Sequence, residues 1–268
     1  QKYWKDIDIY FGGSEHATGH LLYSRFYQKF LYDLDYLNHD EYSKKLINQG
    51  MILGNSAFIY RKSDTNQYIS SNLISNTKVD KVRIDIKYVK GNNQVDYNIL
   101  KSKDSDFKNS TFKLEDGIFN CVREQEKMSK SKFNVVNPDE ICDQYGADTL
   151  RMYEMFLGPI DQSKPWDTRG ISGVHSFLKK FWGLFFKNGL FNVSEKKPSN
   201  ESLKSLHKAI KKITEDIEKL SLNTCVSSFM ICVNELSSIG CNNRSVLEEL
   251  LILISCLLYT SDAADDLL

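Results

Sequence analysis

The chain has 268 residues, of which 41% are hydrophobic and 26% are charged, so it can bury a sizeable core and form more than one domain. Lysine and arginine together number 35, as do aspartate and glutamate, which excludes bulk electrostatic attraction to nucleic acid and leaves only a local patch. The six cysteines form no Cys-x-x-Cys pair, which argues against zinc ribbons and disulfide frameworks and indicates a reducing, cytoplasmic compartment.

The first segment, residues 1–53, has a strand–helix–strand pattern. Ile7–Phe11 is predicted to be a buried strand, and Gly12-Gly13 then gives the backbone freedom to turn. Ser14 is expected to cap a helix whose apolar residues recur at helical spacing: Leu21, Leu22, Phe26, Phe30 and Leu31. Lys45–Leu53 is interpreted as another helix end that leads into a buried strand, which would complete a βαβ half of a parallel sheet.

Three polar side chains follow the diglycine and are candidate ligands of a nucleotide. Backbone donors at a helix start can approach ribose or phosphate, and Glu15 could accept hydrogen bonds from ribose hydroxyls. His16 and His20 lie one helical turn apart, which leaves three interpretations open: a packing role, direct substrate contact, or a zinc site. Zinc is the least favoured, because the carboxylate precedes the first histidine, whereas the His-Glu-x-x-His pattern places it after.

The residue pattern changes over residues 54–117, which are predicted to form a small β-containing insertion. Val79, Val82, Ile84, Ile86 and Tyr88 mark a strand-rich stretch with charged residues on its other face, and Gly91-Asn92-Asn93 signals a turn. The charged face is interpreted as solvated.

A lysine-serine loop follows at Lys127-Met128-Ser129-Lys130-Ser131. Two lysines three residues apart, with small hydroxyl residues beside them, suit a mobile loop that closes over a polyphosphate, because lysine offers a point charge with three donors. The pentamer alone is weak evidence, since a short Lys/Ser run is usually a solvated loop.

Residues 118–164 are assigned to this loop and a helical junction. Asn137-Pro138 is a helix-start signal in which Asn137 caps and Pro138 takes the first position. Gly146–Arg151 begins a further helix that ends near Gly158-Pro159. Lys164–Asp167 is predicted to be a linker at a domain boundary.

Residues 165–255 are predicted to form an antiparallel helical bundle. Four apolar stripes at three-four spacing are expected to form its core: Val174, Phe177, Leu178, Phe181, Trp182 and Phe185; Leu203, Leu206, Ile210, Ile213, Ile217 and Leu220; Val226, Phe229, Met230, Val233 and Leu236; Val246, Leu247, Leu250, Leu251 and Ile254. The lysines 204, 208, 211 and 212 lie on the outer face of the second helix. A solvated face is the default interpretation, and contact with an RNA backbone is the alternative.

The ends of the chain carry two further expectations. The strand pattern begins so early that the domain is expected to start upstream of residue 1, and residues 256–268 are interpreted as an adaptor-derived tail. The longest apolar stretch, Leu250 to Leu258, is too short to cross a bilayer, so no membrane association is expected.

Five motifs, taken together, resemble leucyl-tRNA synthetase. They are Gly12–Phe26, Gln49-Gly50-Met51, Lys127–Ser131, Gly146–Arg151 and Lys164–Asp167. They occur in the family's order, and the likeness covers most of residues 1 to 255. Sibling synthetases for isoleucine, valine and methionine share the lysine-serine loop but typically carry an acid followed by glutamine where this chain has Glu15-His16, which favours leucine.

The resemblance implies a fold and a reaction. The fold is α/β plus all-α: the second half of a Rossmann-like class I synthetase core with its insertion, followed by an anticodon-side helical bundle. The reaction is the ATP-dependent formation of leucyl-adenylate, then transfer of leucine to tRNA(Leu), by a monomer whose magnesium is carried on the ATP phosphates without a protein-bound metal.

The resemblance also implies roles for individual residues. Lys130 stabilises charge on the departing pyrophosphate, and Lys127 assists loop closure. The predicted ATP-binding residues are Gly12, Gly13, Glu15, His16, Met128, Ser129, Lys130 and Ser131, with His16 and His20 near the aminoacyl pocket.

The chain lacks the family's His-Ile-Gly-His signature, the acid that holds the leucine ammonium, and most or all of the editing domain. A partial, inactive enzyme is therefore expected. Two alternatives remain: a non-catalytic helical RNA-binding module with a degenerate nucleotide fold, and a zinc hydrolase using His16 and His20.

Overall fold

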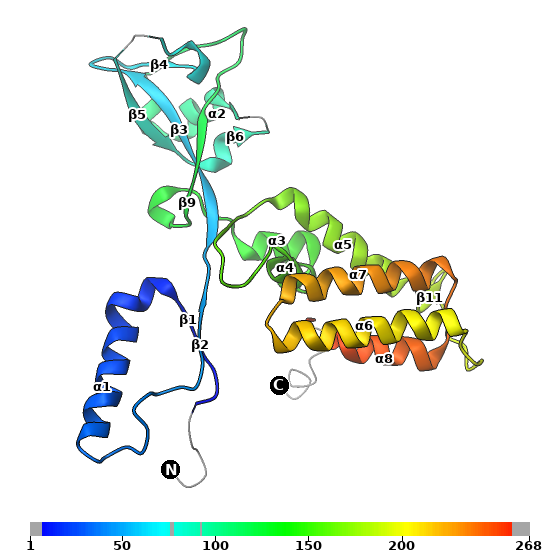
Figure 1. Ribbon diagram of the computed structural model, residues 1–268. Helices are drawn as coiled ribbons and strands as arrows, with labels where there is room; N and C mark the ends of the chain where they lie inside the picture. Colours follow the sequence, from blue (N-terminus) through cyan, green and yellow to red (C-terminus); the bar gives the residue numbers. More distant parts are fainter. Residues whose placement is uncertain (1–6, 76–77, 92, 259–268) are drawn as a thin grey trace. The chain divides into compact units, whose positions relative to one another are not determined.

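The computed structural model describes residues 7–75, 78–91 and 93–258, in which eight α-helices and twelve strands give a mixed α/β fold (Figure 1). These residues divide into two compact units, one made of residues 52–136 and one of the described residues on either side of it. Within the described part of the chain, no helix is long and apolar enough to cross a membrane. The predicted boundaries at 53, 117, 164 and 255 stay predictions.

The N-terminal strand–helix–strand segment is present. β1 (Tyr10–Gly13) pairs in parallel with β2 (Leu46–Gln49), and α1 (Leu22–Asp33) connects them. The details differ from the prediction, because the strand begins at Tyr10 and contains both glycines instead of turning at them. Ser14 makes no capping bond; the helix opens with a 3-10 turn and then a π turn before becoming α-helical.

The predicted apolar face of α1 is exposed. Leu22, Phe26 and Phe30 are 60%, 64% and 47% exposed, and α1 has no buried residue. Ile9 and Phe11 of the strand segment are exposed as well. Apolar side chains normally lie against another layer, and no other described element buries this face.

The residues that follow the loop form two helices and a packed junction. α3 (Pro138–Tyr145) begins as predicted, with the Asn137 side chain accepting a bond from Asp139 N, and α4 (Ala147–Phe156) follows. Lys164–Asp167 is not a loose linker: after the short strand β10 (Lys164–Pro165), Trp166 is buried and meets the Tyr153 ring edge-on. Tyr153 hydroxyl donates to the Asp167 carbonyl oxygen.

Four more helices complete this unit: α5 (Thr168–Trp182), α6 (Asn200–Glu218), α7 (Leu222–Ser238) and α8 (Arg244–Ser255). A small hairpin of β11 (Phe186–Lys187) and β12 (Leu190–Phe191) separates the first two. α6 and α7 lie side by side, joined by a tight turn (Figure 1).

Most of the predicted stripe residues are buried, including Val174, Ile213, Phe229 and Leu250. Three predicted core residues are exposed instead, namely Trp182, Ile217 and Leu251. Cys225 and Cys232, which the stripes omitted, are buried in α7, and all six cysteines are free. Leu257 and Leu258 are buried although the predicted tail begins at 256; residues 259–268 lie outside the described residues.

The unit of residues 52–136 is built on the long strand β3 (Ile52–Lys62). One edge of β3 pairs antiparallel with β5 (Val79–Ile84); the other pairs with β9 (Val122–Lys127) and with β4 (Gln67–Ile69). β8 (Thr111–Lys113) runs parallel to β4. The hairpin β6 (Val89–Lys90) and β7 (Gln94–Val95) and the helix α2 (Tyr97–Lys103) complete it.

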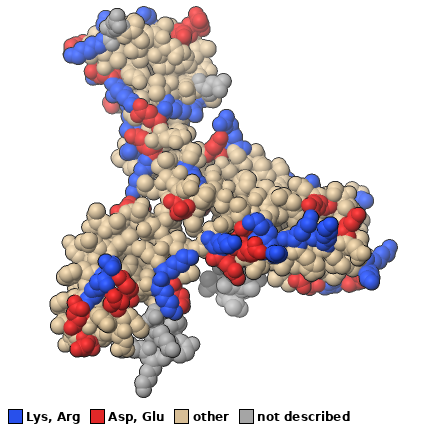
Figure 2. All heavy atoms as spheres, viewed as in Figure 1, with Lys and Arg blue, Asp and Glu red and all other residues tan. Residues whose placement is uncertain are grey.

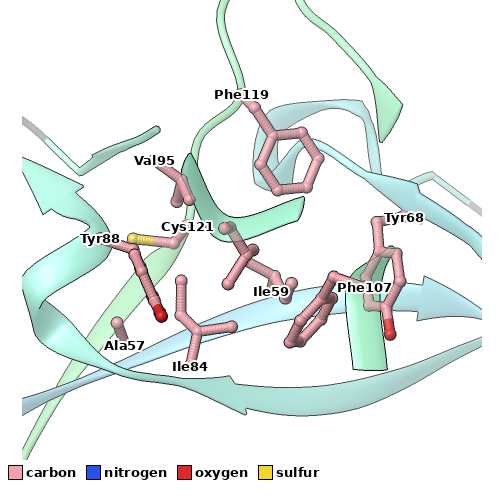
Figure 3. Close-up of a cluster of buried hydrophobic side chains, with 10 residues drawn as sticks. Ala57, Ile59, Tyr68, Ile84, Tyr88, Val95, Phe107, Phe119 and Cys121 are labelled. Atoms are coloured by element: carbon pink, nitrogen blue, oxygen red, sulfur yellow. The ribbon is translucent and has the colours of Figure 1, made fainter. Parts of the chain in front are cut away.

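Aromatic and aliphatic side chains gather on one side of this sheet (Figure 3). Ile59 of β3 and Phe119 are fully buried there, together with Leu100 of α2. The predicted strand through Tyr88 is shorter than expected: β5 ends at Ile84, and residues 86–88 form a 3-10 turn. The turn predicted at Gly91–Asn93 connects β6 to β7, with Asn92 outside the described residues.

Candidate functional site

The lysine-serine loop begins where β9 ends. Lys127 is the last residue of β9 and pairs in register with Leu53 of β3, so the loop starts from a paired strand. Residues 130–132 form a single 3-10 turn that ends at Phe133, which has a left-handed backbone (φ 50°). A bulky residue is unusual in this region, where a side chain costs about 1–2 kcal/mol.

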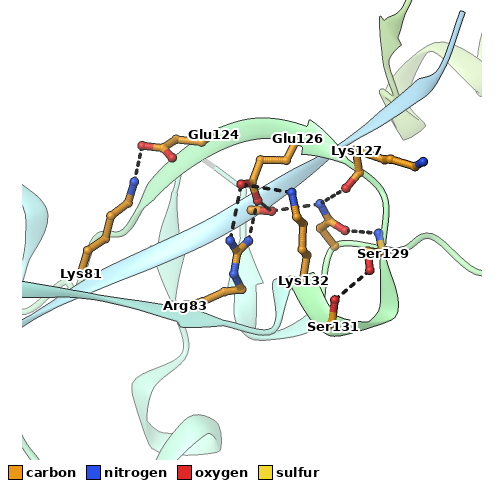
Figure 4. Close-up of polar contacts among 10 residues, drawn as sticks. Lys81, Arg83, Glu124, Glu126, Lys127, Ser129, Ser131 and Lys132 are labelled. Atoms are coloured by element: carbon orange, nitrogen blue, oxygen red, sulfur yellow. Dashed lines mark hydrogen bonds and ion pairs between the residues drawn. The ribbon is translucent and has the colours of Figure 1, made fainter. Parts of the chain in front are cut away.

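Lys127 and Lys130 are both exposed, and among the described residues neither pairs with an acidic side chain. Ser129 and Ser131 face one another with their hydroxyl oxygens 2.9 Å apart (Figure 4). The loop therefore presents two cationic groups and two hydroxyls to solvent, a donor set that suits an anionic oxygen ligand.

The base of the loop is fastened by Asn134, which is only 2% exposed. Its carboxamide oxygen accepts a hydrogen bond from Ser129 N (2.9 Å), and its Nδ2 donates to Ser56 Oγ (2.9 Å) and to the Lys127 carbonyl oxygen (3.3 Å). The same side chain thus bonds the backbone on both sides of Met128. The ammonium groups of the loop are therefore exposed, whereas Asn134 restrains its backbone.

Glu126 lies beneath this contact and gathers charged neighbours. Its carboxylate accepts from Ser56 Oγ (2.5 Å) and Arg83 Nη1 (2.6 Å), and Lys132 Nζ lies 3.4 Å away (Figure 4). The hydrogen bond from Arg83, followed by that from Ser56, lowers the pKa of Glu126 to about 2. Glu126 is therefore ionised near neutral pH and compensates Arg83 and Lys132, leaving Lys127 and Lys130 uncompensated.

Gly54 allows this arrangement because a side chain there would have no room. A Cβ at Gly54 would overlap the Asn134 carbonyl oxygen and lie 3.0 Å from Met128 Cγ. The loop and β3 therefore approach each other at backbone distance, which only glycine permits.

The diglycine segment belongs to the other unit. The Glu15 carboxylate folds back over Gly13, so that a Cβ at Gly13 would overlap it. Gly13 itself is buried in the strand, while Glu15 and His16 are exposed. In the structure, Gly13 allows a close approach of backbone and carboxylate, and neither glycine has a positive φ.

His20 contacts Tyr10: the hydroxyl hydrogen-bonds to Nε2, and the two rings stack with centroids 5.9 Å apart. Tyr42 packs edge-on against Tyr10, with ring centroids 5.2 Å apart. Within the described residues, no group of three His, Cys, Asp or Glu side chains could hold a metal ion. The structure therefore pairs His20 with the phenol of Tyr10.

The basic face of α6 consists of Lys204, Lys208, Lys211 and Lys212, all exposed. Lys212 pairs with the nearly buried Asp216 at 2.7 Å. Figure 2 shows lysine and arginine side chains gathered along this helical region, interspersed with acids. This face is therefore a modest local patch of positive charge in a chain without net charge.

Sequence reasoning missed Asn134, Ser56, Glu126 and Arg83. One signal was available: Lys81 and Arg83 alternate on one strand and Glu124 and Glu126 on another, which is the pattern of side chains pairing across a sheet. Lys81 does meet Glu124 at 2.5 Å. The sequence contains no comparable signal for Asn134, whose partner Ser56 lies 78 positions away.

A protein-family model matches one part of this chain. The model of the family described as tRNA synthetases class I (I, L, M and V) matches residues 116–167. That stretch contains the lysine-serine loop, its Asn134 anchor and the helices α3 and α4.

Curated relatives match nearly the whole chain. A leucine–tRNA ligase of Christiangramia forsetii is 57% identical over 255 residues, covering 95% of this chain and 26% of the relative. A leucine–tRNA ligase of Flavobacterium psychrophilum is 56% identical, covering 95% and 27%. The chain thus spans about a quarter of the length of the relatives it matches.

A solved structure is similar as well. The ternary complex of Agrobacterium radiobacter K84 agnB2 LeuRS with tRNA and LeuAMS matches with a TM-score of 0.56 and 25% identity. The match covers 93% of this chain and 25% of that protein.

Proposed function

Because this chain is related along 95% of its length to leucine–tRNA ligases, we propose that it is the segment of such a ligase that carries the lysine-serine loop. The whole protein then activates leucine with ATP and transfers it to tRNA(Leu) in protein synthesis, in the cytoplasm. The observation that carries this proposal is the 51–57% identity to relatives of that name, together with two exposed, uncompensated lysines on an anchored loop.

In the activation step, the leucine carboxylate attacks the α-phosphate of ATP, and pyrophosphate leaves. Negative charge grows on the departing oxygens, so cationic donors placed there stabilise the transition state more than the ground state. Lys130 is assigned to that charge, and Lys127 to phosphate contact during loop closure. Ser129 and Ser131 supply neutral donors beside them, and magnesium arrives on the ATP phosphates.

The diglycine segment is assigned to the adenosine end of ATP. Gly12 and Gly13 permit close approach of the nucleotide to β1, and the exposed Glu15 carboxylate can accept bonds from the ribose hydroxyls. His16 and His20 are assigned to the pocket around the aminoacyl group, with Tyr10 holding the orientation of His20.

The finer architecture also belongs to this proposal. β1, α1 and β2 are assigned to a Rossmann-like parallel sheet whose remaining strands come from other parts of the protein. The exposed apolar face of α1 supports this assignment, because such a face normally lies under another layer. Helices α5–α8 are assigned to an anticodon-side bundle, with the basic face of α6 as a tRNA contact, in a monomeric enzyme.

The test is pyrophosphate exchange by the complete gene product. We expect exchange that depends on leucine and is much weaker with isoleucine, valine or methionine. The chain alone is expected to give no exchange, because it is a partial enzyme. Even the misplacement of one group by about 1 Å can lower the rate 10²-fold. A complete, folded protein without leucine-dependent exchange would refute the ligase assignment and favour a non-catalytic RNA-binding module.

A further inference from the structure

The side chain of Asn134 is a buried polar group whose hydrogen bonds go mainly to the backbone of the loop. It accepts from Ser129 N and donates to the Lys127 carbonyl oxygen and to Ser56. Lys127 and Ser129 flank Met128, so one carboxamide spans the first three residues of the lysine-serine pentamer. A contact of this kind restricts the backbone dihedrals that aim the lysines.

The orientation of the carboxamide is determined by its neighbours. The backbone N–H of Ser129 can only donate and the carbonyl of Lys127 can only accept, so the oxygen and nitrogen of Asn134 cannot exchange places without losing both bonds. Ser56 Oγ accepts from Asn134 and donates to Glu126, which Arg83 holds in turn. Asn134 is thereby the inner end of a directed chain of hydrogen bonds that passes through three strands, β3, β9 and β5.

The backbone of this segment is fixed as well. Gly54 brings β3 against the Asn134 carbonyl oxygen, and Ile86 N donates to the carbonyl oxygen of the adjacent Phe133 at 3.1 Å. Asn134 is therefore a rigid support for the loop. The lysine side chains, in contrast, point to solvent without a partner among the described residues.

We propose that Asn134 is a positioning residue for Lys127 and Lys130. By clamping the backbone around Met128, it holds the loop in the conformation from which both ammonium groups reach the leaving pyrophosphate. The proposal rests on the proposed function, and it adds a residue that does not itself touch the substrate. A purely structural anchor would alter stability and leave turnover by the folded enzyme unchanged.

The test uses the complete gene product carrying Asn134→Ala, with Asn137→Ala as the matched control. Asn137 is an exposed asparagine three residues away that caps α3. For Asn134→Ala we expect kcat of leucine-dependent pyrophosphate exchange to fall at least tenfold, with the KM for leucine within twofold of the parent. Asn137→Ala should leave both within twofold.

Two further variants separate the loop contacts from the rest of the chain of hydrogen bonds. Asn134→Asp keeps the acceptor for Ser129 N but turns a carboxylate toward the Lys127 carbonyl oxygen, so its kcat should fall at least as far. Ser56→Ala leaves both loop contacts in place and should lower kcat only about twofold to fivefold. If Asn134→Ala fails to fold, the comparison of Ser56→Ala with Asn134→Asp still tests the clamp. A larger fall in kcat for Ser56→Ala than for Asn134→Asp would contradict it.

A second readout is independent of activity. Trypsin cleaves after Lys127, Lys130 and Lys132, and lysines of α6 such as Lys204 serve as an internal reference. We expect loop cleavage in Asn134→Ala to rise at least fivefold relative to the reference, with no rise in Asn137→Ala. Unchanged cleavage, or raised cleavage with unchanged kcat, would overturn the positioning role. If the parent protein shows no leucine-dependent exchange, the proposed function fails while the cleavage comparison still decides whether the clamp exists.

Discussion

Replacing Lys130 by alanine should separate catalysis from folding. The Lys130 side chain is exposed and, among the described residues, has no acidic partner, so its loss should change the free energy of unfolding by less than about 0.5 kcal/mol. If the lysine acts on charge that grows in the transition state, the activation free energy should rise by about 2–4 kcal/mol. That rise corresponds to a fall in kcat of roughly 30-fold to 900-fold.

The size of the effect decides between a closed and a solvated loop. Two unit charges 4 Å apart attract by only about 1 kcal/mol in bulk water, equivalent to about fivefold in rate. A larger loss requires the loop to exclude water when it closes. The assay is leucine-dependent pyrophosphate exchange by the complete gene product, with the KM for leucine measured alongside.

Lys132→Ala is the matched control for this experiment. Lys132 lies in the same turn but is directed to Glu126, so its removal should lower kcat less than tenfold. A Lys130→Ala enzyme within fivefold of the parent, or a Lys132→Ala enzyme that is equally impaired, would refute the assignment of Lys130 to the leaving group.

Four other predictions test separate parts of the account. Glu15→Gln should raise the KM for ATP several-fold and leave the melting temperature unchanged, because an amide accepts weaker hydrogen bonds from ribose than a carboxylate; an unchanged KM would remove Glu15 from the site. Phe133→Gly should be more stable than Phe133→Ala by about 0.5–1 kcal/mol in denaturant titrations, since φ is positive there; the reverse order would contradict the left-handed backbone. The pKa of Glu126 is about 2 in the folded protein and ordinarily 4.5, so its ionised form stabilises the fold fully above about pH 4.5, and this stabilisation is lost as the pH falls toward 2. Acid should therefore destabilise Glu126→Gln less than the parent. Curves of stability against pH that run parallel for the two proteins would count against the ion pair. Reversing the charges of Lys204 and Lys208 should weaken tRNA binding and flatten its salt dependence, whereas equal affinity and slope would establish a solvated face.

Local signals predicted the helices after the loop well. Asn137-Pro138 caps and opens α3 as expected, because capping depends on residues within one helical turn. The apolar spacing of α6–α8 likewise identified most of their buried residues. Interactions of short range in the sequence are sufficient for such elements.

The N-terminal segment shows where local signals fail. Helical spacing predicted an apolar face on α1, yet Phe26 is 64% exposed, because no described element packs over it. Ser14 was predicted to cap, but the chain passes from β1 into a 3-10 turn without a side-chain bond. Burial and entry geometry depend on neighbours that a local pattern does not contain.

The candidate site divides in the same way. The lysines could be found from their spacing and from the resemblance, whereas Asn134 could not. Its partners Ser56, Lys127 and Ser129 come together only when β3 pairs with β9, and no short-range pattern encodes that contact. Residues that position catalytic groups are commonly of this kind, because they act through tertiary contacts.

The most direct test of the central claim is an exchange of segments between related proteins. Residues 1–255 of this chain would replace the matching quarter of the Flavobacterium psychrophilum leucine–tRNA ligase, to which the chain is 56% identical. The same hybrid with Lys130→Ala serves as the inactive control. Leucylation of tRNA(Leu) would then be measured with radiolabelled leucine. We expect the hybrid to charge tRNA(Leu) within about tenfold of the parent ligase and the Lys130→Ala hybrid to lose most of this activity. A hybrid that melts cooperatively, like the parent, but does not charge tRNA(Leu) would contradict the claim that this chain is a functional segment of a leucine–tRNA ligase.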